Sequence, residues 1–542
     1  MSEEIDLEDF APWLVVILLI MGGWARLFLL DSKGMWLDET FSVWLANKSV
    51  GEMLGWIVKI DQHPPLYYLL LHAWIALKDS SPYHVRLLSA LFGIGTIPII
   101  YLIGKRISGV GLGLGAAVFL ALSPYHIYYA QETRMYTLLA FNAAVALYAL
   151  VCLLTDSRSA QPIGSQFREY LRAWRTHVPE KSSLEGDGTT HRPSLQMIET
   201  DLAWVLLMGF SAATLLTHNT AVLFILATNL FVFGLLLYQR LNPFGSPTAF
   251  QIPSLKNWMK AQLGIFILWS PWLLTFIRQV RSVDQEFWLP KPGWNTIVQT
   301  LRAFLNASAS TQASQVMTWS LCALLCLGLV YFRKKLSIIL FLITLFAVPF
   351  LGELLVSLRR PIFYDKTLIW ITIPMFLLLA AGVTQLRFRL FIIGVVGLLC
   401  TNYLFSAGDY YRWMQKEDWL TPAGYVANFA QNGDLVLFNS NFVVISFDYY
   451  FEPYEDLYSI QIERLGVPLD LYQDEVLEPK MTEADIPGLL SMLHDRDRVW
   501  LVYSHNDYTD PLSLIPQTLA TKMELTQTRE FYGGQVQLYE TP

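Results

Sequence analysis

The chain has 542 residues, of which 54% are hydrophobic and only 15% are charged. Soluble globular proteins carry about 25% charged residues. The net charge of −7 gives no sign of a surface that binds a polyanion. The composition therefore excludes a soluble enzyme, a nucleic-acid-binding protein and a disordered scaffold.

Long apolar runs with few charges recur along most of the chain. Each is long enough, or nearly so, to cross a hydrocarbon core of about 30 Å as a helix. Because a chain in lipid must satisfy its backbone polar groups within each helix, we predict a polytopic α-helical membrane protein with about eleven spans. The clearest runs are residues 11–30, 111–130, 135–154, 202–217, 221–238, 313–332, 336–356, 367–383 and 390–406.

Three polar blocks interrupt these runs and are expected outside the bilayer. The first is residues 31–64 after the first span, the second is residues 155–200, and the third is everything after about residue 407. The middle block combines Ser, Gly, Pro and mixed charge, which is typical of a partly disordered or interfacial loop.

The tail after residue 407 has shorter apolar runs than the rest of the chain. Runs of strand length at 434–439 and 498–504 alternate with helix-like stretches at 419–430 and 482–494. This alternation predicts a small soluble α/β domain over residues 407–542, after a membrane domain over residues 1–406. The tail could recognise a substrate or simply cap the membrane helices.

The basic residues in short loops predict the orientation. Placing the amino terminus in the cytoplasm puts the loop at 155–200 and the basic group at 333–335 on the cytoplasmic side. The first outer loop, residues 31–85, and the tail then lie on the opposite side. The outer loops also carry several basic residues, so the charge asymmetry is weak. Either the orientation is the reverse, or these outer basic residues contact a ligand, which is the interpretation that we favour.

Two adjacent carboxylates, Asp38 and Glu39, begin about eight residues after the first span, near a surface of low dielectric constant. A carboxylate there needs a partner or a task, such as accepting a proton from an attacking hydroxyl or holding a cation. The alternative is that Asp38 caps a helix beginning at Glu39.

His63 precedes two prolines, which suit the first turn of a helix beginning near Leu66 and fix the approach of His63 to it. This His could contact a ligand, or it could be a surface residue paired with Asp61. Asp38, Glu39, Asp61 and His63 could also hold a divalent cation, although their spacing fits no strict ligand pattern, so the metal is unknown.

The segment SPYHIYYAQETRMYTL, residues 123–138, lies at the outer junction of two predicted spans. Its tyrosines suit an interfacial aromatic belt. Its ionisable residues are better explained by convergence of several span ends on one site. The candidates from this junction, and from a predicted outer turn further along, are His126, Glu132, Arg134, Tyr136 and His218.

A basic set lies in later outer loops and comprises Arg278, Arg281, Lys291, Arg359, Arg360 and Lys366. Arginine forks match phosphate oxygens, so with the carboxylates these residues predict a site for a phosphate-bearing, membrane-dissolved substrate. Ordinary contact with anionic lipid is the alternative. No Walker-type Gly-rich loop is present, which disfavours a cytosolic nucleotide as the direct donor.

Four features together resemble the polytopic GT-C glycosyltransferases, above all glycosyltransferase family 39, which includes protein O-mannosyltransferases and lipid A aminoarabinose transferases. They are the Asp-Glu pair after the first span, H-P-P-L, R-L-L-S-A-L-F-G and S-P-x-H-x-x-Y-x-Q-E-x-R. The resemblance covers residues 11–406 in architecture and is specific in motifs mainly over residues 24–136.

The resemblance implies inverting transfer of a sugar from a polyprenyl-phosphate carrier to a protein, lipid or polysaccharide acceptor. The site would face the non-cytoplasmic side of a bacterial plasma membrane. Asp38 matches the first-loop catalytic aspartate, and His63 matches a position near the carrier phosphate. Arg134, Arg359 and Arg360 match phosphate contacts by position.

Two other functions are kept as alternatives, namely a flippase or transporter of lipid-linked glycans and an oligosaccharide ligase. A transporter is expected to place ionisable residues near the bilayer midplane and to have repeated halves. The sequence has no evident internal repeat, and its charges lie at span ends.

Overall fold

The computed structural model describes residues 7–60, 63–156, 199–242, 248–282, 291–305, 312–386 and 389–542. The chain forms two compact units. The first comprises Met1–Phe28, Ser89–Gln131 and Met135–Tyr410, and the second comprises Leu29–Leu88, Glu132–Arg134 and Tyr411–Pro542. The expected division of the chain at residue 406 stays a prediction.

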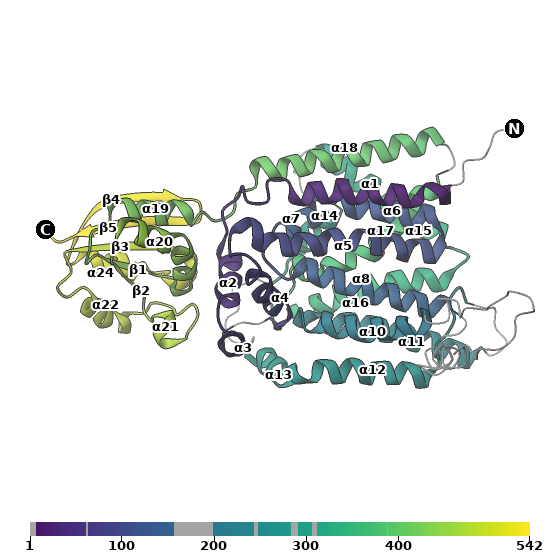
Figure 1. Cartoon of the computed structure of the whole chain (residues 1–542), viewed down its shortest axis with the longest axis horizontal. Coiled ribbons are helices and arrows are strands. Elements are labelled where there is room, and N and C mark those ends of the chain that lie inside the picture. Colours follow the sequence, from purple (N-terminus) through teal and green to yellow (C-terminus); the bar gives the residue numbers. More distant parts are fainter. Residues whose placement is uncertain are drawn as a thin grey trace, which may run out of the picture. The chain divides into compact units, whose positions relative to one another are not determined.

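The first unit consists of helices, and its long helices lie side by side along a common direction (Figure 1). Two of them, α5 (Pro82–Ser108) and α18 (Arg389–Trp413), begin or end in the second unit. The others are α1 (Leu7–Leu27), α6 (Val110–Leu122), α7 (Pro124–Ala130), α8 (Tyr136–Thr155), α10 (Glu199–Leu215), α11 (Val222–Leu241), α12 (Leu255–Trp269), α13 (Leu273–Ser282), α14 (Trp294–Phe304), α15 (Gln312–Tyr331), α16 (Leu336–Ser357) and α17 (Thr372–Thr384), with 3-10 turns η3 (Asn219–Ala221), η4 (Ser270–Trp272) and η5 (Asp365–Ile371).

Within the described residues, seven helices are long and apolar enough to cross a membrane, or eight if the bent pair α6 and α7 is one span. Shorter apolar helices occur at Leu66–Ile75, Thr200–Leu215 and Met317–Tyr331. The prediction of a multi-pass α-helical membrane protein is confirmed. The total of about eleven spans stays a prediction.

The run predicted at 111–130 is not one straight helix, because the chain bends by 57° between α6 and α7. Pro124 disfavours a helical conformation at Ser123, the residue before it. The side chain of Ser123 instead accepts a hydrogen bond from the backbone N–H of His126 and caps α7. The residues that follow α7 therefore leave the direction of α6.

The second unit joins the first loop to the tail. Its loop helices are α2 (Leu37–Ala46), α3 (Val50–Lys59) and α4 (Leu66–Ile75). Pro65 is the N-cap of α4, which confirms the helix start predicted near Leu66. In α2, by contrast, the N-cap is Trp36, so the alternative in which Asp38 caps a helix is wrong.

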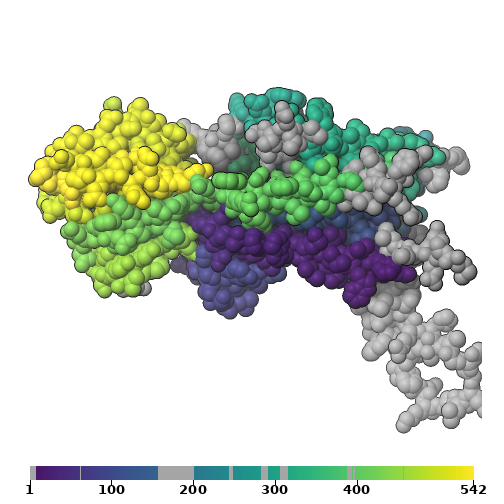
Figure 2. Space-filling view, turned by 90° about the horizontal axis from the view of Figure 1, so that it is seen from above, coloured from purple at the N-terminus to yellow at the C-terminus, as the bar shows by residue number. Residues whose placement is uncertain are grey.

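The tail holds one five-stranded sheet in the order β2-β1-β3-β5-β4. β1 is parallel to β2 and β3, and β5 is antiparallel to β3 and β4. Figure 2 shows the tail residues, light green to yellow, gathered in one compact body. The strands are β1 (Leu435–Phe438), β2 (Glu463–Gly466), β3 (Arg498–Ser504), β4 (Glu524–Phe531) and β5 (Gly534–Glu540), and the helices are α19 (Leu420–Phe429), α20 (Val444–Tyr458), α21 (Leu471–Asp474), α22 (Ile486–Met492), α23 (Asn506–Thr509) and α24 (Leu514–Ala520), with 3-10 turns η6 (Asn441–Val443) and η7 (Glu483–Asp485).

The strands predicted at 434–439 and 498–504 are β1 and β3, so the prediction of a small α/β tail is confirmed. Their apolar residues are buried on both faces, as expected of central strands that are covered by helices on each side. The stretch predicted as helix at 419–430 is α19, and the one at 482–494 is the 3-10 turn η7 followed by α22.

Helix α2 shares a hydrophobic core with the tail. Leu37, Phe41 and Trp44 pack against the core that α19, α20 and the sheet bury between them. The hydroxyls of Thr40 and Ser446 lie 2.6 Å apart, in hydrogen-bond contact. Asp38 and Glu39 therefore sit on a helix that the tail holds in place.

Candidate active site

Glu39 is fully buried and bound by two cations. The guanidinium of Arg86 donates to both carboxylate oxygens, at 2.8 and 2.7 Å. The ammonium of Lys416 lies 3.1 Å from Oε2, and the backbone N–H of Thr133 donates to Oε1 at 2.9 Å. Burial alone would raise the pKa of Glu39, but Arg86 and Lys416 outweigh it and lower the pKa to about 2.

Arg86 also fixes the chain that leads into α2. Its guanidinium donates to the backbone carbonyls of Leu30, Lys33 and Gly34, at 2.8 to 2.9 Å. It thereby ties the chain after the first span to Glu39. These bonds fix both the position of α2 and the rotamer of Glu39.

Asp38, the second residue of α2, has different surroundings from Glu39. Its side chain is 30% exposed, and its Oδ2 lies 3.7 Å from Nε of Arg134. Its backbone carbonyl accepts from the Ser42 hydroxyl at 2.8 Å and from Arg134 Nη1 at 3.4 Å. Asp38 is thus a carboxylate that a solvent-borne group can reach, with a cation beside it.

Arg134 and Glu132 come from the tyrosine-rich junction. Arg134 is buried, and its Nη1 donates to the Tyr68 hydroxyl at 3.3 Å and to the Ser42 hydroxyl at 3.2 Å. Oε1 of Glu132 lies 3.4 Å from the Lys416 ammonium. The structure therefore brings Glu132 and Arg134 together with Asp38 and Glu39.

These contacts define a charged cluster in the second unit, with ion pairs at 2.7 to 3.7 Å. Its carboxylates and cations balance, so burying them together does not leave an uncompensated charge. Asp38 is the most exposed of its members, and Arg134 is buried beside it. The members of the charged cluster are Asp38, Glu39, Arg86, Glu132, Arg134 and Lys416.

Sequence reasoning missed Arg86 and Lys416. Arg86 had a signal, because it is a charge in the first turns of the apolar helix α5 and opens the R-L-L-S-A-L-F-G motif. Lys416 had none, because it is 377 residues from Glu39 in the chain and its own neighbours carry no motif.

Lys366 lies in η5 of the first unit and is buried among tyrosines. Its ammonium is 4.5 Å from the ring centroid of Tyr364 and 5.2 Å from that of Tyr136, as in cation–π contacts. The neighbouring Asp365 carboxylate accepts from the Tyr129 hydroxyl at 3.3 Å. Lys366 and Tyr136, two predicted site residues, are therefore close to each other.

The two predicted histidines of the first unit have structural partners. A ring nitrogen of His126, which is buried, lies 2.8 Å from the Thr372 hydroxyl. His218 caps η3, and its Nδ1 lies 2.9 Å from the Thr220 hydroxyl. Both side chains therefore have polar partners within the first unit, and their place in the site stays a prediction.

The remaining predicted residues differ in exposure and partners. Arg278 and Arg359 are exposed. The guanidinium of Arg360 donates to the backbone carbonyl of Val280. His63 is half-buried in the turn before α4, and Asp61 lies outside the described residues.

In the part of the chain that the structure describes, no group of three or more His, Cys, Asp or Glu side chains could hold a metal ion. Glu39, one member of the predicted cation site, is bound by Arg86 and Lys416 instead. Because Asp61 is not described, the site at Asp38, Glu39, Asp61 and His63 stays a prediction, which an EDTA titration of activity checks.

Residues 62–164 match a family model described as dolichyl-phosphate-mannose-protein mannosyltransferase. No curated protein sequence matches the chain. Among solved structures, ArnT from Cupriavidus metallidurans is similar in the apo state, with a TM-score of 0.57, 12% identity and 98% of each chain covered. The same protein bound to undecaprenyl phosphate gives a TM-score of 0.56 and 11% identity, again over 98% of each chain.

The archaeal oligosaccharyltransferase AglB from Archaeoglobus fulgidus, in complex with an inhibitory peptide and a dolichol-phosphate, is also similar. Its TM-score is 0.50 at 9% identity, over 99% of this chain and 74% of that chain. At such identities the likeness shows the fold alone. The chain therefore has the fold of these membrane enzymes, and the expected resemblance to the GT-C glycosyltransferases of family 39 is confirmed.

Proposed function

We propose that this chain is an inverting glycosyltransferase that moves a sugar from a polyprenyl-phosphate donor to an acceptor on the non-cytoplasmic face of a bacterial plasma membrane. The observation that carries the proposal is the pair of Asp38 and Arg134, in which a partly exposed carboxylate lies 3.7 Å from a buried guanidinium. The fold shared with ArnT and AglB, and the matching family model over residues 62–164, support the reaction class.

In the proposed reaction, Asp38 is the general base. The acceptor hydroxyl donates a hydrogen bond to the Asp38 carboxylate and attacks the anomeric carbon of the sugar. As the new carbon–oxygen bond forms, the bond to the phosphate breaks on the opposite face, and the proton passes to Asp38. The products are the glycosylated acceptor and the polyprenyl phosphate.

Arg134 is proposed to neutralise the charge that develops on the departing phosphate. Its bonds to Tyr68 and Ser42 hold the guanidinium in one orientation before substrate binds. Such preorganised charge stabilises a transition state more than a mobile charge does. His63, Arg359, Arg360 and Lys366 stay predictions as carrier-phosphate contacts.

Glu39 is proposed as a positioning residue. Its carboxylate is fully buried, accepts from Arg86, Lys416 and Thr133, and has its pKa lowered to about 2. A base that transfers a proton near neutral pH needs a higher pKa and access to the acceptor. Glu39 and its cations therefore hold α2, and with it Asp38, in place.

The test measures release of free polyprenyl phosphate by the purified protein. Wild type and Asp38→Asn are given a panel of radiolabelled polyprenyl-phosphate sugars with candidate acceptors. We expect release by wild type and a loss of about 10²- to 10⁴-fold in Asp38→Asn. Asp31→Asn, the same change at an exposed position of the same loop, is the matched control and should keep full turnover.

Thermal unfolding of each variant shows whether it is folded. Retained turnover in folded Asp38→Asn would remove Asp38 from the role of base. Carrier binding without release in either protein, with acceptors present, would favour the alternative of a flippase or an oligosaccharide ligase.

A further inference from the structure

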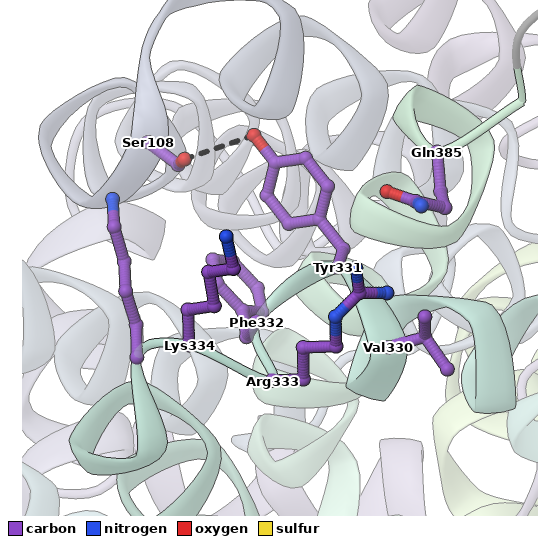
Figure 3. Close-up of a pocket in the computed structure, with 8 residues that line it drawn as sticks. Ser108, Val330, Tyr331, Phe332, Arg333, Lys334 and Gln385 are labelled. Carbon is purple, nitrogen blue, oxygen red and sulfur yellow. Dashed lines mark hydrogen bonds between the residues drawn. The ribbon is translucent and has the colours of Figure 1, made fainter.

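A hollow of the first unit lies where α5, α15, α16 and α17 end or begin (Figure 3). The charged cluster belongs to the second unit. None of the described residues that line the hollow is acidic. The polar residues that line it are Ser108, Tyr331, Arg333, Lys334, Lys335 and Gln385.

The hollow is lined by hydroxyl groups and cations. The Ser108 and Tyr331 hydroxyls lie 3.0 Å apart, in hydrogen-bond contact. Figure 3 shows Lys334 extending from the turn between α15 and α16 toward this pair, and Arg333 extending toward Val330 and Gln385. A guanidinium fork, ammonium groups and hydroxyl donors around one space are the groups that bind phosphate oxygens.

This hollow is distinct from the predicted donor-phosphate contacts of the first unit. Gln385 directly follows α17, whereas Lys366 lies at the beginning of the same 20-residue span, Asp365–Thr384. A helix of that length is about 30 Å long, which is the thickness of the hydrocarbon core. Lys366 and the hollow therefore lie at opposite ends of one membrane span.

The surroundings of the hollow suit a lipid better than a water-soluble anion. Val330 lines the hollow and is 41% exposed, and Leu336 and Leu340 on α16 are 62% and 50% exposed. In a multi-pass membrane protein such apolar side chains face acyl chains. A lipid can place its phosphate on the cations and its acyl chains on these residues at the same time.

Two helices beside the hollow pack at close range. Gly328 on α15 and Gly382 on α17 lie where the two helices meet, and a Cβ at either position would collide with the backbone of the other helix. Glycine at such contacts lets two helices pack at close range. Tyr331 and Gln385, each three residues further along, therefore line the hollow just beyond this close contact.

We propose that this hollow binds the phosphate group of an anionic membrane lipid, in the leaflet opposite to the Lys366 end of the span. The orientation predicted from the basic residues makes this the cytoplasmic leaflet. The bound lipid joins the end of α5, the turn between α15 and α16, and the end of α17. The proposal does not depend on the proposed sugar transfer.

The test uses the full chain in detergent, with binding of dihexanoyl phosphatidylglycerol measured by native mass spectrometry. The triple variant Arg333→Gln, Lys334→Gln and Lys335→Gln should bind this lipid at least about tenfold more weakly than wild type. The control variant, Arg240→Gln, Lys256→Gln and Lys260→Gln, removes the same charge from exposed positions and should bind like wild type.

The triple variant removes basic residues that also influence how the chain is oriented in the membrane. A second variant therefore keeps every charge. Tyr331→Phe with Gln385→Ala should weaken phosphatidylglycerol binding about threefold. Phosphatidylcholine, which has a phosphate but no net charge, should bind wild type and the triple variant alike.

Three results would each overturn the proposal. The control variant could lose as much affinity as the triple variant, which would show a nonspecific charge effect. Phosphatidylglycerol could bind the triple variant as well as it binds wild type. Inorganic phosphate could bind the hollow as tightly as the lipid does, which would make this a site for a water-soluble anion.

Discussion

Asp38 and Glu39 are neighbours with opposite surroundings. The side chain of Asp38 is 30% exposed beside Arg134, whereas that of Glu39 has no exposed surface and accepts both branches of the Arg86 fork. Consecutive helical residues point about 100° apart, so one carboxylate can face the core while the next faces solvent. Burial and ion-pair partners therefore distinguish Glu39, the proposed positioning residue, from Asp38, the proposed base.

Arg86→Gln should destabilise the protein strongly. Without the fork, Glu39 is a buried charge that keeps only Lys416 and one backbone N–H, and removing one partner of a buried pair costs about 3–5 kcal/mol. Chemical denaturation of the purified protein measures the loss. Arg106→Gln, at the exposed far end of the same helix α5, should change stability by less than about 1 kcal/mol. Equal losses in the two variants would contradict the role of Arg86.

Stability should fall in acid because of Glu39. Its pKa is lowered from 4.5 to about 2 in the folded protein. The stability from its ionised form is therefore present above about pH 4.5 and is lost as the pH falls toward 2, by at most about 3 kcal/mol. Unfolding midpoints between about pH 6 and pH 3 should drop less steeply for Glu39→Gln than for wild type. Parallel curves would contradict this assignment.

Arg134→Lys should raise the apparent KM for the lipid-linked donor about tenfold, because an ammonium cannot reproduce the bonds of the guanidinium to Tyr68 and a phosphate together. The KM for the acceptor should stay unchanged. Arg240→Lys, at an exposed position, is the control. A change confined to acceptor kinetics would show that Arg134 does not contact the carrier phosphate.

At the scale of elements, helix contacts depend on where small residues fall. Gly328 and Gly382 bring α15 and α17 into backbone contact, whereas Gly209 on α10 has open space where a Cβ would be. Helix α2 has ten residues and includes the two adjacent carboxylates of the charged cluster. Its packing against α20 and the tail core sets which of its side chains face inward. Short elements are thus positioned by their neighbours more than by their own sequence.

Gly328→Ala should destabilise the protein by about 1–3 kcal/mol, because the new Cβ meets the backbone of Leu378 and the two helices must separate. Gly209→Ala should be neutral or slightly stabilising, because alanine is the better helix former. Thermal unfolding of both variants is the measurement. Equal behaviour would show that α15 and α17 do not depend on this close contact.

At the scale of the whole molecule, each unit is assembled from distant segments. The second unit needs Leu29–Leu88, Glu132–Arg134 and Tyr411–Pro542 together. Lys416 of the tail bridges Glu39 and Glu132, and the tail core receives Leu37, Phe41 and Trp44. The tail is therefore part of the structure that holds Asp38.

A chain ending at Tyr410 should lose sugar transfer and should expose α2, α3 and α4 to protease. It lacks Lys416 and the core on which α2 packs, whereas the helices of the first unit keep their own contacts. Limited proteolysis with mass spectrometry locates the cuts. A chain lacking only Thr541 and Pro542 is the control. An unchanged cleavage pattern in the short chain would favour the tail as a simple cap.

The sequence by itself determined what depends on local composition and period. Apolar runs predicted the membrane helices, the paired prolines predicted the start of α4 at Leu66, and short buried runs predicted β1 and β3. Asp38, Glu132 and Arg134 were selected as candidates because each lies in a recognisable motif or next to a span end, and their roles stay predictions.

Tertiary structure alone decided how those residues are used. Lys416 lies 377 residues from Glu39 and Arg86 lies 47 from it, so no local pattern predicts that both bind its carboxylate. The pairing of Asp38 with Arg134, and the place of Trp36 instead of Asp38 as N-cap, follow from how α2 packs. A charge becomes a base or a structural ion through its burial and its partners, and both arise only when distant segments meet.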